Sequence, residues 1–291
     1  MDTNISQNNN RKNIIIIVLS IIIIILVILL ITQFIYNNKD SNSDSKNSES
    51  ITETNKNNDS ENENLEKNNY IIKYEKQEYN TKKNNVIITN NSRNIIEITN
   101  KKNPTAASKI LNSINFYSDA SWNNIVLSAD DITSSEMDFS ELPQPTGLGA
   151  TLKITDNQYS NNVITFNLLV EGSFGGVGWG ETTSYNYDIE TGELLTLNSI
   201  SKDSESFNKK INELVKQELI IIKKEGTDLF DDYESEVPNQ INTQGNWRFT
   251  SEGIEIIFQK YSIAPGATGS IIVQLNKNLI NEYLLDKYKF N

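Results

Sequence analysis

Residues 254–269 read IEIIFQKYSIAPGATG, a run of aliphatic and aromatic residues that leads directly into a loop rich in Gly and Ala. The run predicts a strand over 254–261, and a second strand over 270–275 follows the loop. On the other side, a turn at 251–253 leads back to a strand over 247–250. Strands joined by such short connections pair antiparallel, so this stretch predicts an antiparallel sheet.

The chain before and after this stretch predicts helices and further strands. Asp203 or Ser204 begins an amphipathic helix whose apolar face runs from Phe207 to Ile222, and Gly226 stands where a C-terminal cap belongs. Asn103 and Pro104 predict the start of another helix. The other expected elements are strands over 70–79, 86–88, 95–98, 151–154, 163–170, 184–189 and 194–197, and a helix over 279–288. We therefore expect an α+β fold with mostly antiparallel sheets and packed helices, preceded by one transmembrane helix.

The expected transmembrane helix spans residues 14–36. Every residue over 14–31 except Ser20 is Ile, Val or Leu, which gives the roughly 20 apolar residues that a membrane helix needs. A cleaved secretory signal would have a shorter apolar core of about 7–15 residues and a small-residue cleavage site, which this stretch lacks. Arg11 and Lys12 precede the span, so the positive-inside rule places residues 1–13 in the cytoplasm. We expect a single-pass protein of the cell membrane with its C-terminal part outside the cell.

Residues 37–69 are almost entirely polar and charged, and they predict a disordered linker because they cannot bury enough apolar surface to fold. The patterned remainder divides, on the Pro- and Gly-containing break over 142–149, into an N-terminal part over 70–146 and a C-terminal part over 147–291. Most of the net charge of -12 belongs to these two parts.

Composition excludes several classes of chemistry. The 291 residues include no Cys and no His, so thiol nucleophiles, disulfides, imidazole bases and the usual zinc ligands are all missing. The acidic balance argues against a protein that grips nucleic acid through its phosphates. No cofactor is expected.

Carboxylates are the remaining acid and base candidates: Asp130 with Asp131, Glu136 with Asp138, and a run of acids over 228–236. A glycosidase needs two carboxylates that face each other across a cleft, and neighbours in sequence do not provide this. The acidic run could collect calcium, but it lacks the spacing of a known calcium loop. Solvated loops are the favoured interpretation, so we predict neither a catalytic nor a metal site.

Two Gly-rich loops carry the candidate binding residues. One is GSFGGVGWG over 172–180 and the other is IAPGATG over 263–269, and each follows a strand. Neither has the spacing or the Lys of a phosphate-binding loop, and the glycines could simply permit tight turns and close backbone approach. The alternative is that the loops expose aromatic anchors on a recognition surface. The candidate partner-binding residues are Phe174, Gly175, Gly176, Trp179, Tyr261, Ile263, Pro265 and Gly266, whereas Trp122 and Trp247 are expected in the core.

These loops, together with Tyr185-Asn-Tyr-Asp188, Thr191-Gly192 and Leu197, carry a resemblance to a known family. Residues 70–291 resemble the extracytoplasmic region of the lysozyme-sensing anti-sigma factor RsiV, which is found also ahead of the catalytic domain of the peptidoglycan deacetylase PdaC. The run FQKYSIAPGATG over 258–269 is the most specific part of the likeness.

The sequence also departs from the family. Val177, Gly178 and Trp179 replace the segment of the first loop in which the family commonly has a His, so no role of that His can be carried over. Neither the sigma-binding segment nor the deacetylase domain has a counterpart in this sequence. The resemblance therefore implies a non-catalytic recognition domain on a Gram-positive cell envelope that binds a basic protein such as lysozyme. The alternative is a peptidoglycan- or glycan-binding module that stacks sugar rings on Trp179.

Overall fold

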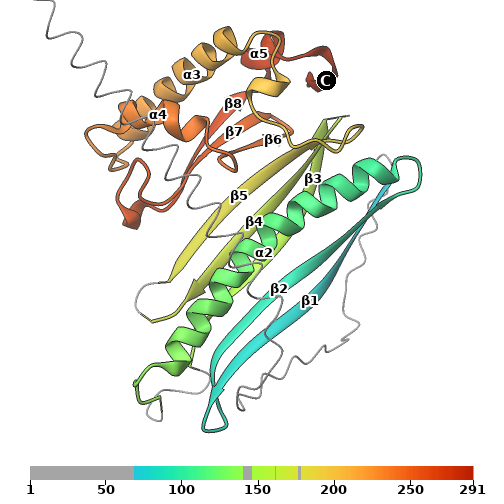
Figure 1. The fold of residues 1–291 in the computed structure, drawn as a ribbon. Coiled ribbons are helices and arrows are strands. Elements are labelled where there is room, and N and C mark those ends of the chain that lie inside the picture. The colour runs from blue at the N-terminus through green and yellow to red at the C-terminus, as the bar shows by residue number, and fades with distance from the viewer. Residues whose placement is uncertain (1–68, 140–145, 161, 176–177, 291) are drawn as a thin grey trace, which may run out of the picture. The chain divides into compact units, whose positions relative to one another are not determined.

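The computed structural model describes residues 69–139, 146–160, 162–175 and 178–290 (Figure 1). The expected cytoplasmic segment, the expected membrane helix over 14–36 and the linker up to residue 68 lie outside these ranges. Among the described residues, no helix has the length and apolarity needed to cross a membrane.

The first half of the fold is a five-stranded sheet with the order β1-β2-β3-β4-β5. Neighbouring strands pair antiparallel except β2 and β3, which run parallel, so this sheet is mixed. Five of the six strand pairings among the described residues are antiparallel, which agrees with the expectation of mostly antiparallel sheets. The connection from β2 to β3 contains a long helix, which brings the chain back to the end where it started and makes the parallel pairing possible. The strands are β1 (Tyr70–Lys83), β2 (Val86–Asn100), β3 (Gly149–Ser160), β4 (Val163–Ser173) and β5 (Trp179–Asp188).

Helix α2 (Pro104–Ser134) lies along one face of this sheet (Figure 1). It begins where the sequence predicts, because the Asn103 side chain accepts a hydrogen bond from the Ala106 amide at 3.1 Å and Pro104 needs no such partner. Its apolar face packs on the sheet and continues through Trp122, which is buried as expected. The runs over 86–88 and 95–98, which the sequence predicts as one or two strands, form the single strand β2. The predicted boundary at 146/147 falls in the connection between α2 and β3.

The second half of the fold packs helices on a three-stranded antiparallel sheet with the order β6-β7-β8. Its core includes Phe207 and Ile211 from the predicted amphipathic helix, Trp247 and Phe258 from the sheet, and Ile263 from the loop that follows. The Asp203 carboxylate caps that helix by accepting from the Ser206 amide at 2.7 Å. The elements are α3 (Ser204–Lys224), α4 (Tyr233–Ile241), β6 (Trp247–Thr250), β7 (Gly253–Phe258), β8 (Ile271–Asn276) and α5 (Lys277–Ile280).

Three expectations for this half are corrected. Helix α4 stands where the sequence predicted only a solvated acidic loop. The expected strand 194–197 is reduced to a bridge between Leu194 and Tyr187. The expected helix over 279–288 ends early, because Leu284 pairs with Ser201 and the Leu285 amide donates to the Ile200 carbonyl at 2.9 Å. The chain there forms α5 and two 3₁₀ turns, η3 (Asn281–Tyr283) and η4 (Asp286–Tyr288).

Buried polar contacts join the two halves. Asn186 on β5 donates to the Trp247 carbonyl at 3.0 Å and accepts from the Phe249 amide at 3.2 Å and from the Thr165 hydroxyl at 2.8 Å. The Ser184 amide donates to the Gly245 carbonyl at 2.9 Å. Because these groups are buried and mutually satisfied, they fix the register between β5 and β6.

Candidate recognition surface

The two Gly-rich loops start from neighbouring points of the fold. The first connects β4 to β5, and the second connects β7 to β8. Gln259, just after β7, donates from Nε2 to the Thr182 carbonyl of β5 at 2.7 Å. Thr182 is three residues from Trp179, and Gln259 is two residues from Tyr261. The structure therefore brings the roots of the two predicted loops together.

The β7–β8 loop is anchored from within. Ile263 is 1% exposed and its side chain belongs to the second core, so this candidate residue holds the loop in place and does not face a partner. The Ile263 carbonyl accepts from the Phe230 amide at 3.0 Å, and the Pro265 carbonyl accepts from the Thr268 amide at 2.9 Å. These contacts give the loop one defined conformation.

Tyr261 is the most exposed aromatic residue of this loop. Its side chain is 68% exposed, and its backbone has a φ of 70°, in the left-handed region that costs a residue with a side chain about 1–2 kcal/mol. Its ring lies against Gly266, where an added Cβ would come within 2.1 Å of Tyr261 Cζ. Gly266 therefore leaves room for the Tyr261 ring in this position, and a side chain at Gly266 would displace the ring. A large side chain that is exposed, strained and supported by its own loop is typical of a functional contact.

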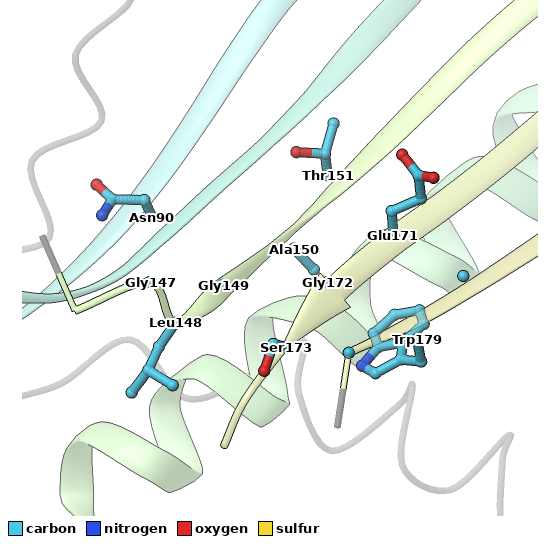
Figure 2. Close-up of a pocket in the computed structure, with 12 residues that line it drawn as sticks. Asn90, Gly147, Leu148, Gly149, Ala150, Thr151, Glu171, Gly172, Ser173 and Trp179 are labelled. Carbon is cyan, nitrogen blue, oxygen red and sulfur yellow. The ribbon is translucent and has the colours of Figure 1, made fainter. Parts of the chain in front are cut away.

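The β4–β5 loop contributes a second aromatic side chain. Trp179 is 37% exposed and lines a cavity of about 630 Å³ beside Glu171 (Figure 2). Phe174 is half-buried against the first core, and Gly175 is exposed with a φ of 100°. Gly176 lies outside the described residues.

Other glycines around this cavity have a structural role. A Cβ on Gly149 would lie 1.9 Å from the Asn90 carbonyl oxygen, and a Cβ on Gly172 would lie 2.5 Å from the Ala150 Cβ. These positions allow the backbones of β2, β3 and β4 to approach closely. Close backbone approach, one of the two interpretations of the Gly-rich segments, therefore applies to Gly172.

An acidic segment packs beside the Tyr261 loop. The sequence analysis did not predict this contact. Leu229 and Tyr233 are buried in the same core as Ile263, while Phe230 remains 38% exposed. The segment over 225–236 contains no Lys or Arg, and its carboxylates are those of Glu225, Asp228, Asp231, Asp232, Glu234 and Glu236. All of these are exposed except Glu236, which is half-buried. Within the described part of the chain, no three carboxylates are grouped closely enough to hold a metal ion.

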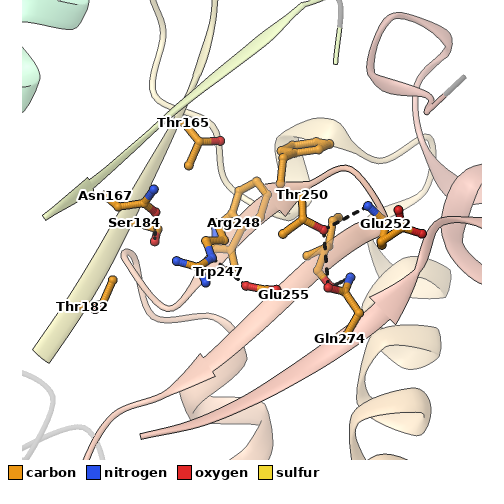
Figure 3. A network of polar contacts seen from close by, with 12 residues as sticks. Thr165, Asn167, Thr182, Ser184, Trp247, Arg248, Thr250, Glu252, Glu255 and Gln274 are labelled. Carbon is orange, nitrogen blue, oxygen red and sulfur yellow. Dashed lines mark hydrogen bonds and ion pairs between the residues drawn. The ribbon is translucent and has the colours of Figure 1, made fainter. Parts of the chain in front are cut away.

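A polar network lies between the two sheets (Figure 3). Arg248 donates from Nε to the Glu255 carboxylate at 2.6 Å, at the edge of a cavity of about 450 Å³ that Lys153 and Asn167 also line. Thr250 and Gln274 extend the network along β6 and β8. Arg248 on β6 and Glu255 on β7 are cross-strand neighbours in the second sheet, so their ion pair stabilises the pairing of these two strands and neutralises the Arg248 charge.

Two further residues that the sequence analysis singled out, Asp130 and Trp247, have structural roles. Asp130 accepts a hydrogen bond from the Tyr79 hydroxyl at 2.6 Å, and burial together with this bond raises the pKa of Tyr79 to about 12. Trp247 is buried as expected.

Asp188, in the Tyr-Asn-Tyr-Asp motif, has a structural role that explains its neighbours. Its carboxylate accepts from the backbone amides of Glu190 and Thr191 at 2.9 Å each, and from Lys287 Nζ at 2.7 Å and the Tyr288 hydroxyl at 2.8 Å. Burial alone would raise the pKa of Asp188, but these hydrogen bonds outweigh it and lower the pKa to about 2. Asp188 thus ties the C-terminal residues to β5.

Comparison with known proteins assigns part of the chain to a family. The model of the DUF3298 family, described as a protein of unknown function, matches residues 198–278, so the chain carries a DUF3298 domain that includes the Tyr261 loop. A DUF3298 family protein from Pseudomonas aeruginosa PAO1 has a similar structure, with a TM-score of 0.50 and 14% identity over 76% of this chain and 96% of its own.

A DUF3298 family member from Bacteroides fragilis NCTC 9343 gives a TM-score of 0.46 at 13% identity, over 74% of this chain and 94% of its own. No curated protein matches the sequence. At these identities the likeness to the P. aeruginosa structure shows the fold, and the function has to be argued from the surface.

Proposed function

We propose that residues 69–290 form a non-catalytic recognition domain that binds a basic protein through the Tyr261 loop and the acidic segment. The observation that carries this proposal is Tyr261, an exposed aromatic side chain held in a strained backbone conformation by an anchored loop. Side chains of this kind, which lose little conformational freedom on binding, are typical energetic centres of protein interfaces.

Lys260 Nζ lies 5.3 Å from the centroid of the Tyr261 ring, but the six carboxylates of the acidic segment outnumber it and favour a basic partner. The carboxylates of the acidic segment stand beside the loop because the Phe230 amide donates to Ile263. An acidic rim around an aromatic centre accelerates association with a positively charged protein and gives specificity. Lysozyme, the partner that the resemblance to the RsiV family implies, has this charge.

The proposed setting follows from the N-terminal sequence. A membrane helix over 14–36 and a polar linker over 37–69 would display the domain outside a Gram-positive cell. The domain would then act as a receptor or a decoy for a basic protein that reaches the cell surface.

Calorimetric titration of a soluble fragment over 69–291 with lysozyme, at low and at moderate salt, tests the proposal. We expect saturable binding that weakens as salt rises, because screening reduces the attraction between exposed charges. Asp231→Asn with Asp232→Asn should weaken binding at low salt. Asp131→Asn with Glu97→Gln, which removes the same number of charges from the other half of the fold, should not. Absence of binding in both buffers would exclude this partner.

A second function is favoured by one observation, the exposed Trp179 beside its open cavity. We propose peptidoglycan or another glycan as the alternative ligand there, because sugar rings stack on exposed indoles. Binding of soluble peptidoglycan fragments would respond little to salt and would be lost in Trp179→Ala. Salt-sensitive binding of the fragments that Trp179→Ala leaves intact would contradict this alternative.

A further inference from the structure

The cavity of about 450 Å³ between the two sheets has no part in the proposed function. Its wall on the first sheet includes Lys153 and Thr155 from β3 and Asn167 from β4, and the strand register places Thr155 directly opposite Asn167. Its wall on the second sheet includes the cross-strand pair of Arg248 and Glu255. We call this space the inter-sheet cavity.

Asn167 is a buried amide with a free donor at this cavity. The residue is only 8% exposed, and its Oδ1 accepts a hydrogen bond from the Ser184 hydroxyl at 2.7 Å. Its Nδ2 has no hydrogen-bond partner among the described residues, but this nitrogen is not one of the unpartnered atoms that are fully enclosed. Figure 3 shows the Asn167 side chain pointing from β4 toward the side on which Arg248 lies. Because a buried amide N–H is rarely left without an acceptor, we expect the cavity to hold one.

The charged side chains of the inter-sheet cavity favour a negatively charged acceptor. Glu255 neutralises Arg248 through an ion pair at 2.6 Å. Lys153 has no ion-pair or hydrogen-bond partner among the described residues, so the lining has two cations against one carboxylate. This local excess of positive charge lies on a chain whose net charge is -12. Water could accept from Asn167, but only an anion also gains from the attraction of Lys153.

We propose that the inter-sheet cavity binds a small organic carboxylate. One oxygen of the ligand accepts from Asn167 Nδ2, and the negative charge is attracted by Lys153. The volume lies within the range of small-molecule sites, about 300–1,000 Å³, and exceeds what a simple inorganic anion would fill. Leu169 offers apolar surface to the carbon part of the ligand, and the unpartnered hydroxyl of Thr182 offers a further polar contact.

This proposal is independent of the proposed function. The inter-sheet cavity shares no residue with the Tyr261 loop, the acidic segment or the Trp179 cavity. Loss of carboxylate binding would therefore leave the binding of a basic protein or of a glycan unchanged, and failure of either of those would leave the carboxylate site unchanged.

The test is a calorimetric titration of the full chain in micelles of an uncharged detergent. The probes are N-acetylglycine and N-acetylglycinamide, which have nearly the same shape and differ in the charge of one group. We expect saturable binding of N-acetylglycine and binding of the amide that is weaker by about tenfold or more. Lys153→Met and Asn167→Ala should each weaken binding of the carboxylate by a similar factor. Lys73→Met is the matched control, because Lys73 is also an exposed lysine of the first sheet without an ion pair, yet does not line the cavity.

Three results would overturn the proposal. If N-acetylglycine does not bind, the cavity holds only water. If the amide binds as tightly as the carboxylate, the site does not recognise the negative charge. If Lys153→Met and Lys73→Met both bind N-acetylglycine as wild type does, the ligand lies elsewhere on the protein. The lysine variants decide the matter even if Asn167→Ala fails to fold, because both lysines are exposed.

Discussion

Replacing Asp188 with asparagine should cost about 2–3 kcal/mol of unfolding free energy at neutral pH, and the cost should shrink as the pH falls towards 2. Asp188 is 1% exposed, and its pKa is lowered from 3.8 to about 2. A pKa difference of this size between the folded and the unfolded chain contributes about 2 kcal/mol to the free energy of unfolding at neutral pH. The variant also turns an amide donor toward Lys287 and the Tyr288 hydroxyl, which donate to the carboxylate in the wild type.

The sign of the pH dependence follows from the direction of the shift. Because the folded-state pKa of Asp188 is depressed, its contribution is fully present above the pKa of the unfolded chain and is lost as the pH falls from about 4 to about 2. Urea unfolding of wild type and Asp188→Asn, followed by tryptophan fluorescence at pH 7, 4 and 2.5, measures the difference. A difference between the two proteins that stays constant across this range would refute the role given to the carboxylate.

Two further substitutions test the backbone geometry. Tyr261→Gly should melt about 2–4 °C above Tyr261→Ala, because glycine relieves about 1 kcal/mol of strain in the left-handed backbone conformation that alanine retains. Equal melting temperatures of the two variants would contradict the presence of this strain. Gly149→Ala should lower the free energy of unfolding by about 3 kcal/mol or more, because the new Cβ would lie 1.9 Å from the Asn90 carbonyl oxygen. Gly178→Ala, whose Cβ would have no contact closer than 3.6 Å, should be nearly neutral when both variants are unfolded in urea. A similar cost at both glycines would argue against the close strand pairing.

The parts of the fold that the sequence predicted are those with local signals. Asn103 and Asp203 cap α2 and α3 as expected, because each cap is decided by side chains within three residues. Helix α4 was missed because it is short and Pro238 interrupts its pattern. The parallel pairing of β2 with β3 was also missed, since nothing in either strand encodes a partner beyond a 31-residue helix.

The candidate surface was predictable in its residues and not in their arrangement. The sequence singled out Tyr261 and Trp179, but a positive φ at a tyrosine follows from the packing of its loop and has no local signal. Ile263 was chosen from the same motif and is buried, because a motif does not show which of its side chains point inward. The contact between Phe230 and Ile263 joins segments more than 30 residues apart, and only the folded chain reveals it.

The measurement that tests the central claim most directly is the affinity of Tyr261→Ala for lysozyme, compared with wild type and with Phe116→Ala. Phe116 on α2 is 69% exposed, which matches the 68% of Tyr261, and it lies on the other half of the fold. We predict that Tyr261→Ala weakens binding by about tenfold or more, corresponding to an anchor worth more than 1.4 kcal/mol, while Phe116→Ala binds as wild type does. Equal affinities of a folded Tyr261→Ala and the wild type would contradict the claim that this loop is the recognition surface.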